Sequence, residues 1–254
     1  MTEEPIKKKK LKSFIFHNRN FSQKTLIEQV LELNDSKEDF TYGNRLFFEI
    51  YNSNKIEGNS LSRIDTKLLL EDKIMPEECK YSDVIESLNL RRALNKFRKI
   101  NSLDLDLILN IHKEITEDLL NNNESGKLRD KKVYITNSMH TPITPKEVPN
   151  KLLTIINDYN SSNRSLRDIF IFKLRFVEIH PFIDGNGRTS RLILNGLLEN
   201  QGLPRIVFRD SDKKFYYTYI EDAIVKYKLD DWVRYCTLHL KFILENLNDP
   251  TILE

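Results

Sequence analysis

Apolar side chains recur at helical spacing along most of this chain, and this pattern is the strongest constraint on its fold. In the segment 45–57, for example, one face of the predicted helix carries Leu46, Phe47, Ile50 and Ile56. Glycine and proline, which interrupt helices, number only 7 and 8 among 254 residues. The sequence therefore predicts an all-α protein with few tight turns.

Other segments repeat the pattern. We expect helices over residues 81–97, 105–115, 147–159, 166–179, 192–198, 215–226 and 230–246. Gly58 and Asn59 should end the helix that begins near residue 45, because glycine is the preferred residue directly after a helix. His112 lies on the apolar face of the segment 105–115, and we interpret it as a core histidine with satisfied hydrogen bonds, not as a ligand.

One segment breaks the helical pattern. In residues 131–142, Val133 and Ile135 alternate with polar residues, and Asn137 with Ser138 forms a predicted turn before a series of prolines. This arrangement predicts a β-hairpin or an extended flap, the only strand structure expected in the chain.

The chemically functional groups concentrate in residues 180–191, whose sequence is HPFIDGNGRTSR. His180 is the one side chain in this stretch that can take up a proton near neutral pH. Asp184 offers a hard carboxylate oxygen of the kind that binds Mg²⁺ beside substrate phosphates. These two residues therefore indicate a base and a metal ligand.

The second half of the stretch has the features of an anion site. Gly185, Asn186 and Gly187 form a turn that opens a helix, and such a turn directs free backbone N–H groups and the positive end of the helix dipole at one point. Arg188 and Arg191 lie three residues apart on that helix and can hold phosphate oxygens. Base, metal ligand, backbone donors and arginines together indicate phosphoryl or nucleotidyl transfer.

The stretch also resembles the signature of the Fic family, HPFx(D/E)GNGRxxR, at every fixed position. The resemblance implies a Fic-type helical bundle with a small β-hairpin flap. It also implies transfer of AMP from ATP to a Ser, Thr or Tyr hydroxyl of a protein, including the protein itself, with Mg²⁺ or Mn²⁺ as cofactor. His180 would deprotonate the hydroxyl, Asp184 would hold the metal, and residues 185–188 and Arg191 would bind the nucleotide. The alternative is a glycine-rich turn whose histidine and arginines make only structural hydrogen bonds.

A second motif, SNKIEG, occupies residues 53–58. Alone it says little, because a serine four residues before a glutamate simply shares a helix face with it. Beside the first motif, Ser53, Glu57 and Gly58 resemble the inhibitory (S/T)xxxE(G/N) motif of Fic proteins. The resemblance implies that Glu57 pairs with Arg191 and occupies the place of the ATP γ-phosphate, since two anions repel strongly at one cation. We therefore expect a protein that inhibits itself.

The resemblance extends to a target-docking flap and to an aromatic pair beside the adenosine. The flap residues would be Val133, Tyr134, Ile135, Asn137, Ser138, Met139 and His140. An exposed strand there could pair with an extended target segment, or the hairpin could simply close the fold. Tyr216 and Tyr217 look like the aromatic pair, but they could equally pack on the helical core. Ile224 stands where several relatives carry an asparagine near the adenine, so strict preference for adenine stays open.

We expect one Fic domain over residues 40–246, with the inhibitory helix at about 45–58 and the flap at about 131–142. A basic segment and a leading helix (1–39) would precede it, and a tail (247–254) would follow. The lysine run at 7–12 is interpreted as a solvated terminus, not as a nucleic-acid-binding arm. Lys plus Arg number 40 and Asp plus Glu 38, and this near-neutral balance argues against nucleic acid as a partner.

Cys79 and Cys236 lie far apart and form no metal-binding pair, which favours a reducing compartment. The sequence contains neither an apolar run long enough to cross a membrane nor an apolar leader, so we expect a cytoplasmic protein. Two other functions stay open: removal of AMP from a modified protein at the same site, and a non-enzymatic module that binds anions or nucleic acid. The target and any homo-oligomer are likewise left open.

Overall fold

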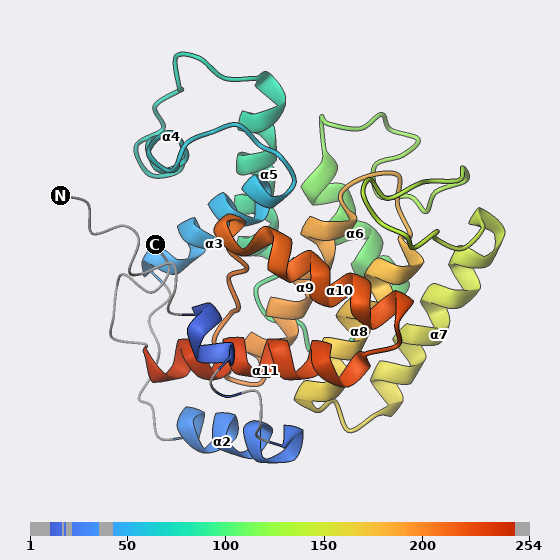
Figure 1. Cartoon of the computed structure of the whole chain (residues 1–254). Coiled ribbons are helices and arrows are strands. Elements are labelled where there is room, and N and C mark those ends of the chain that lie inside the picture. The colour runs from blue at the N-terminus through green and yellow to red at the C-terminus, as the bar shows by residue number, and fades with distance from the viewer. Residues whose placement is uncertain (1–10, 17, 19–21, 36–42, 247–254) are drawn as a thin grey trace.

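The computed structural model describes residues 11–16, 18, 22–35 and 43–246, and all regular secondary structure in these ranges is helical (Figure 1). The longer helices are α2 (Gln23–Asp35), α3 (Gly43–Ile56), α4 (Arg63–Lys67), α5 (Tyr81–Lys96), α6 (Leu105–Thr116), α7 (Val148–Ser161), α8 (Leu166–Ile179), α9 (Asn186–Asn200), α10 (Lys213–Val225) and α11 (Leu229–Glu245). Short helical turns are η1 (Leu68–Asp72), η2 (Pro145–Glu147) and η3 (Asp210–Asp212). The predicted all-α fold class is confirmed.

Helix α9 forms the centre of the bundle. Of its 15 residues, 13 are buried, and α3, α6 and α8 pack directly against it. Figure 1 shows α9 enclosed by the other helices, with α11 running along α2 at the edge of the molecule. A helix that is apolar on all sides has to be enclosed in this way, and the run 192–198 is of that kind. The first turn of α9, which carries the GNGR sequence, is therefore held in a rigid frame.

Helix α3 is anchored on α9 by buried polar groups. The Glu49 carboxylate accepts a hydrogen bond from Asn195 Nδ2 (2.9 Å) and pairs with Arg205, whose Nε lies 2.6 Å away. All three side chains are buried, so a satisfied polar network fixes the position of α3 along α9.

The end of α3 is a Schellman motif. Gly58 N–H donates to the Lys55 carbonyl (3.1 Å) and Asn59 N–H donates to the Asn54 carbonyl (3.2 Å). Gly58 has φ +102°, a conformation that side chains disfavour. The predicted helix stop at Gly58 is confirmed, and it makes Glu57 the residue that caps the helix.

The β-hairpin expected over residues 131–142 is not formed, and this part of the prediction is wrong. The segment is an extended flap: Tyr134 is 80% exposed while its neighbours Val133 and Ile135 are half-buried, so the predicted alternation is present. A turn closes through Ser138 N–H to the Ile135 carbonyl (3.2 Å). The returning arm contains Pro142 and the next helical turn begins at proline, and proline has no N–H to donate to a ladder.

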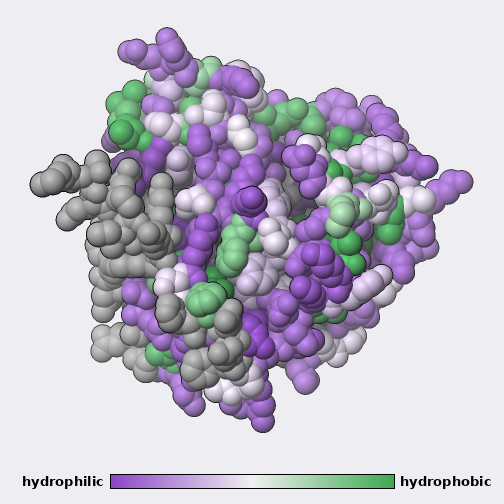
Figure 2. Space-filling model, viewed as in Figure 1, coloured by the Kyte–Doolittle hydropathy of each residue, from purple (hydrophilic) through white to green (hydrophobic). Residues whose placement is uncertain are grey.

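The surface in this view is mainly hydrophilic, and apolar groups gather around α4 and the segment that follows it (Figure 2). Ile64, Ile74 and Met75 are among the exposed apolar side chains there. Within the described ranges, no helix combines the length and apolar character needed to cross a membrane. Most of the lysine run and the tail 247–254 lie outside the described residues.

Candidate active site

His180 ends helix α8 in a left-handed conformation, with φ 53° and ψ 63°. Such a conformation is uncommon for a residue other than glycine, so the surroundings have to hold it. Arg129 does so: its Nε donates to the His180 carbonyl (2.7 Å), and its backbone N–H donates to the Pro181 carbonyl (2.9 Å). Burial lowers the pKa of His180 to about 4, so the imidazole is neutral at physiological pH and able to accept a proton.

The loop after His180 is held by two polar side chains. Asn186 turns its amide back onto Phe182, accepting from the backbone N–H and donating to the carbonyl, both at 2.9 Å. His112 stacks on the Phe182 ring at 3.6 Å between centroids and lies 2.9 Å from the Asp184 carbonyl through Nε2. Its Nδ1 accepts from Gly126 N–H (3.0 Å), so Nε2 carries the proton and donates. The prediction of a satisfied core histidine is confirmed, and this histidine also positions the loop.

Gly185 begins α9 with φ 77°, and a Cβ there would lie 2.9 Å from Thr116 Cγ2. Both the backbone conformation and this close approach therefore require glycine. The first helical hydrogen bond runs from Thr189 N–H to the Gly185 carbonyl (2.9 Å). The backbone N–H groups of residues 186–188 consequently have no acceptor within the helix, which is the arrangement of an anion site.

The SNKIEG segment (residues 53–58) contacts the end of the HPFIDGNGRTSR signature at Arg191. Glu57 Oε1 lies 2.8 Å from Arg191 Nη2, so the expected ion pair is formed. Ser53 adds two acceptors: its hydroxyl binds Nε and its carbonyl binds Nη2, both at 2.9 Å. Burial by itself would lower the pKa of Arg191, but Glu57 together with Tyr216 and Tyr217 outweighs burial, and the pKa lies above its ordinary value.

Glu57 also lies against the first turn of α9. A Cβ placed on Gly187 would collide with Glu57 Oε1 and would lie 3.0 Å from Arg191 Nη1. The carboxylate thus sits where the helix offers its free N–H groups and its positive dipole end. A side chain at position 187 would exclude Glu57 from this place.

Arg188 and Asp184 are placed differently from each other. The Arg188 side chain is 3% exposed, and its Nη1 lies 2.9 Å from Glu86 Oε1 on α5. Glu86 also accepts from Asn59 Nδ2 (2.8 Å), which links the end of the inhibitory segment to the signature. The Asp184 side chain is 66% exposed, and its Oδ1 accepts from Gly185 N–H at 2.6 Å. Arg188 thus pairs with Glu86 and, at 3.5 Å, with Asp184, whose carboxylate still faces solvent.

The two tyrosines proposed to contact adenosine have separate environments. Tyr216 is 1% exposed and packs on Phe208 with 4.5 Å between ring centroids, as the core-packing alternative predicts. Tyr217 is 39% exposed, and burial together with nearby Glu57 raises its pKa to about 12. Ile224 packs against the core. Tyr217 is therefore the solvent-exposed member of the pair.

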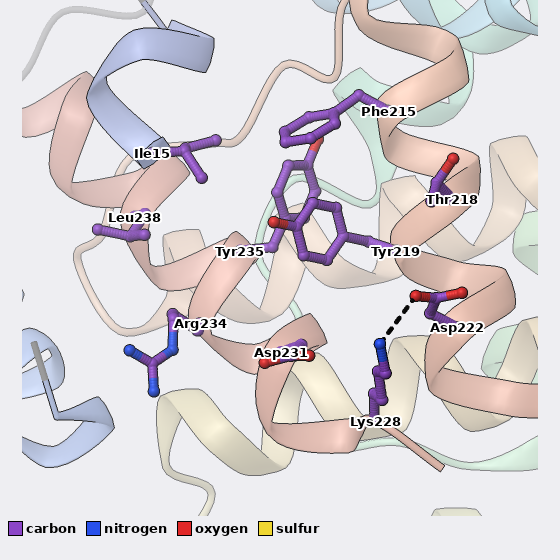
Figure 3. Close-up of a pocket in the computed structure, with 10 residues that line it drawn as sticks. All are labelled: Ile15, Phe215, Thr218, Tyr219, Asp222, Lys228, Asp231, Arg234, Tyr235 and Leu238. Carbon is purple, nitrogen blue, oxygen red and sulfur yellow. Dashed lines mark hydrogen bonds and ion pairs between the residues drawn. The ribbon is translucent and has the colours of Figure 1, made fainter. Parts of the chain in front are cut away.

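Another face of α10 borders a cavity of about 530 Å³ between α10, α11 and Ile15 (Figure 3). Aromatic rings of Phe215, Tyr219 and Tyr235 form one wall, and Asp222 pairs with Lys228 at another. None of its lining residues belongs to either motif. This cavity is separate from the site around His180.

Residues 102–198 match the sequence profile of the Fic/DOC family, and they span the flap and most of α9. The chain is 30% identical over 187 residues to the protein adenylyltransferase Fic of Nematostella vectensis, covering 70% of this chain and 43% of that protein. The chain belongs to the Fic/DOC family. It is 29% identical over 203 residues to protein adenylyltransferase fic-1 of Caenorhabditis elegans, covering 76% and 39%. The chain therefore spans about two-fifths of the length of these relatives.

Solved Fic structures share the fold. A fragment of C. elegans Fic-1 (residues 134–508) superposes with a TM-score of 0.77 at 24% identity, covering 89% of this chain and 72% of the fragment. A Fic-domain-containing signaling protein of Bacteroides thetaiotaomicron superposes with a TM-score of 0.78 at 22% identity, covering 87% and 96%. At these identities the likeness establishes the fold.

Several residues of this Fic site were not found from the sequence. Arg129 was not among the predicted site residues, yet its guanidinium donates to the Lys131 carbonyl (3.1 Å) and the Ile143 carbonyl (2.5 Å) as well as to the His180 carbonyl. Glu221 on α10 accepts from Ser138 Oγ and Met139 N–H, both at 2.6 Å, and so holds the turn of the flap. These contacts replace the absent strand ladder.

Replacing Arg129 with methionine should loosen the flap and the His180 turn together. The side chain is 3% exposed, and its loss would leave several carbonyls without donors, at a cost of about 2–4 kcal/mol in the free energy of unfolding. Urea denaturation and limited proteolysis in residues 131–144 measure the two effects. Arg175→Met on α8 is the control, because Arg175 forms a surface pair with Glu178 and should change stability by less than about 1 kcal/mol. Equal behaviour of the two variants would contradict this role.

Proposed function

We propose that this Fic domain transfers AMP from ATP to a hydroxyl group of a protein. The observation that carries the proposal is that the loop from His180, a neutral histidine, leads to the N-terminus of α9. Glu57 of the same chain occupies the anion site at this N-terminus. The names of the relatives, protein adenylyltransferases, support the same reaction.

In the proposed reaction His180 removes the proton from a target Ser, Thr or Tyr hydroxyl. The oxygen attacks the α-phosphorus of ATP, the bond to the bridging oxygen breaks, and pyrophosphate leaves. Free N–H groups of residues 186–188 and the Arg191 guanidinium stabilise the negative charge on the phosphates. The proton transfer itself would contribute about 10²–10⁴-fold to the rate.

Asp184 fits the role of a metal ligand. Its carboxylate is 66% exposed, and nowhere in the described residues do three His, Cys, Asp or Glu side chains gather as a metal site. A single carboxylate suits Mg²⁺, which keeps most of its water and phosphate ligands, and Mn²⁺ would fit as well. When bound, the cation would offset phosphate charge.

Asp184→Ala should therefore reduce turnover at limiting Mg²⁺ by about ten-fold or more, with little change in stability, because the carboxylate is largely exposed. The rate of AMP incorporation measured against Mg²⁺ concentration should shift its midpoint upward. Asp158→Ala, an exposed aspartate on α7, is the matched control. An unchanged midpoint would place the metal elsewhere.

We also propose that Glu57 inhibits the reaction. Its carboxylate lies between Arg191 and the first turn of α9, the groups that would bind the ATP γ-phosphate. Two anions at one buried guanidinium repel strongly, so ATP either fails to bind or binds with its α-phosphate displaced from in-line attack.

A second candidate reaction, removal of AMP from a modified protein, uses the same residues. Burial lowers the pKa of His180, and the nearby Glu57 carboxylate partly opposes this effect. The Glu57 side chain is 28% exposed to water. Glu57 and His180 together could orient a water molecule toward the phosphorus of a protein-bound AMP.

Labelled nucleotides test these functions. The wild type and Glu57→Gly are incubated with Mg²⁺ and lysate, using ATP labelled at the α-phosphate or at the γ-phosphate. Protein-bound label from the α-position alone supports AMP transfer, whereas label from the γ-position would show phosphoryl transfer and overturn the proposal. Release of AMP from purified AMP-protein by the wild type would establish the second reaction. Adding unlabelled GTP as a competitor of labelled ATP tests whether the protein prefers adenine. The sequence leaves this preference open, because Ile224 stands where several relatives carry an asparagine.

A further inference from the structure

The residues directly after Glu57 are tied to the first turns of α5, which packs beside α3 (Figure 1). Asn59 Nδ2 donates to the Asp83 carbonyl (2.9 Å) and to Glu86 Oε2 (2.8 Å). Ser60 donates its backbone N–H (2.9 Å) and its hydroxyl to Asp83 Oδ2. We call these contacts of Asn59 and Ser60 with α5 the α5 latch. The latch begins two residues after Glu57 and fixes the point at which the chain leaves the turn that carries this carboxylate.

The α5 latch is mainly buried and well packed. Asn59 and Asp83 are each 6% exposed, and Asn59 Oδ1 accepts a hydrogen bond from Leu61 N–H at 3.0 Å. Leu61 in turn packs with Val84 of α5 in an apolar cluster apart from the main core. A buried hydrogen-bond network of this kind holds one arrangement of the backbone. The turn that carries Glu57 is therefore held by α5 as well as by α3.

We propose that Asp83 is a positioning residue for Glu57: by holding Asn59 and Ser60 it keeps the Glu57 carboxylate at Arg191 and so sets the strength of the inhibition. The inference rests on the proposed function, because it takes Glu57 to be the inhibitor. A carboxylate whose backbone is already fixed loses little conformational entropy when it pairs with a guanidinium. When the latch is loosened, the same pairing costs more entropy, and the ATP phosphates compete for Arg191 more successfully.

Asp83 is separated from the groups that would bind ATP, whereas Glu86 is not. Glu86 pairs with Arg188 of the signature, so a substitution there would also change the proposed phosphate site. Asp83 lies about one turn earlier on α5, and in the described ranges none of its hydrogen bonds reaches residues 180–191. A substitution of Asp83 can therefore loosen Glu57 without altering the proposed catalytic residues.

The initial rate of AMP incorporation from α-labelled ATP with Mg²⁺ and lysate is measured for Asp83→Ala in two backgrounds, the wild type and Glu57→Gly. In the wild type the substitution should raise the rate by about three- to ten-fold, less than Glu57→Gly itself. In the Glu57→Gly background the rate should change by less than about two-fold, because no carboxylate is left to position. Asp168→Ala is the matched control. Asp168, in the first turn of α8, also accepts from a serine N–H and hydroxyl, those of Ser165, both at 2.8 Å, and its loss should not raise the rate.

Hydrogen exchange separates positioning from a general structural role. In Asp83→Ala the amides of residues 57–61 should exchange faster, while those of α9 stay protected.

Ser60→Ala removes only the hydroxyl of an exposed residue and keeps the test decisive if Asp83→Ala does not fold. It should raise the rate by about two-fold, because Ser60 N–H still binds Asp83, and Ser60→Thr should keep the wild-type rate. Absence of AMP incorporation in every variant, Glu57→Gly included, overturns both this inference and the proposed function. If Glu57→Gly is active but no faster than the wild type, the proposed inhibition falls together with this inference. If Glu57→Gly is faster but the latch variants are not, or if Asp83→Ala raises the rate equally in both backgrounds, this inference alone is overturned.

Discussion

Glu57→Gly should increase AMP incorporation by about 10- to 100-fold, the size of a typical coupling between a blocking contact and a ligand. Removing the carboxylate frees the Arg191 guanidinium and the first turn of α9 for the ATP phosphates. Self-modification on exposed hydroxyls should rise in parallel. Incorporation of label from α-labelled ATP, with and without lysate, measures the effect.

The same substitution should lower stability. Arg191 is 5% exposed in its side chain and would lose its carboxylate partner, although Ser53 would still accept two of its hydrogen bonds. Because Glu57 is 28% exposed, we expect a cost of about 1–2 kcal/mol in the free energy of unfolding. A variant that is less stable and more active points to a group that blocks substrate. Glu57→Gln keeps the shape and removes the charge, so its activity should fall between those of the wild type and the glycine variant.

Arg191→Ala distinguishes relief of inhibition from loss of the phosphate contact. It also frees Glu57, but it removes the proposed γ-phosphate ligand, so activity should fall below that of the wild type. The double variant should match Arg191→Ala, a non-additive result expected for coupled residues. If Glu57→Gly folds but is no more active than the wild type, Glu57 does not inhibit the reaction. Residues 53–58 would then have only a structural role as the end of α3.

Loss of His180 should have the largest effect on the reaction. In the Glu57→Gly background, His180→Ala should lower AMP transfer by about 10²–10⁴-fold, because the base is gone. His180→Asn is the matched control for the backbone, since asparagine tolerates the left-handed conformation at this position better than alanine. Both variants should be inactive, and the asparagine variant should be the more stable. Activity equal to the parent in either folded variant would exclude His180 as the base.

The buried imidazoles also predict how stability depends on pH. Burial lowers the folded-state pKa of His180 and of His112 to about 4, below the ordinary value of 6.5 in the unfolded chain. The unfolded state therefore takes up protons first, and stability is lost as the pH falls from about 6.5 toward about 4. His180→Asn should remove part of this slope.

Contacts between neighbours in sequence were predictable, whereas contacts across the bundle were predictable only where family motifs marked both partners. The stop of α3 at Gly58 follows from local backbone preference, and the pair of Glu57 with Arg191 followed from two motifs. Arg188 was predicted to bind phosphate like Arg191. Its ion pair with Glu86 was not predicted, because Glu86 lies on a helix about 100 residues earlier and no local sequence pattern indicates that contact.

The flap and the tyrosines show two further limits. Alternation at Val133 and Ile135 predicted an extended backbone, but a ladder also needs donors on the returning arm, and Arg129 with Glu221 supplies the contacts instead. Tyr216 and Tyr217 are adjacent in sequence, yet successive residues of a helix point about 100° apart. One ring is therefore buried in the core and the other is partly exposed, a division that pattern alone could not assign.

In the inhibition proposed for Glu57, the Schellman turn at the end of α3 holds the blocking carboxylate on a short tether. Glu49 fastens α3 to α9, and Glu57 follows the last helical residue, so the carboxylate cannot diffuse away from Arg191. Such a group competes with ATP as an intramolecular ligand at a fixed effective concentration, which for short linkers is on the order of millimolar. Diluting the protein leaves this competition unchanged. The ATP concentration at which half the molecules become active is then set by the length and stiffness of the few residues between Ile56 and Asn59.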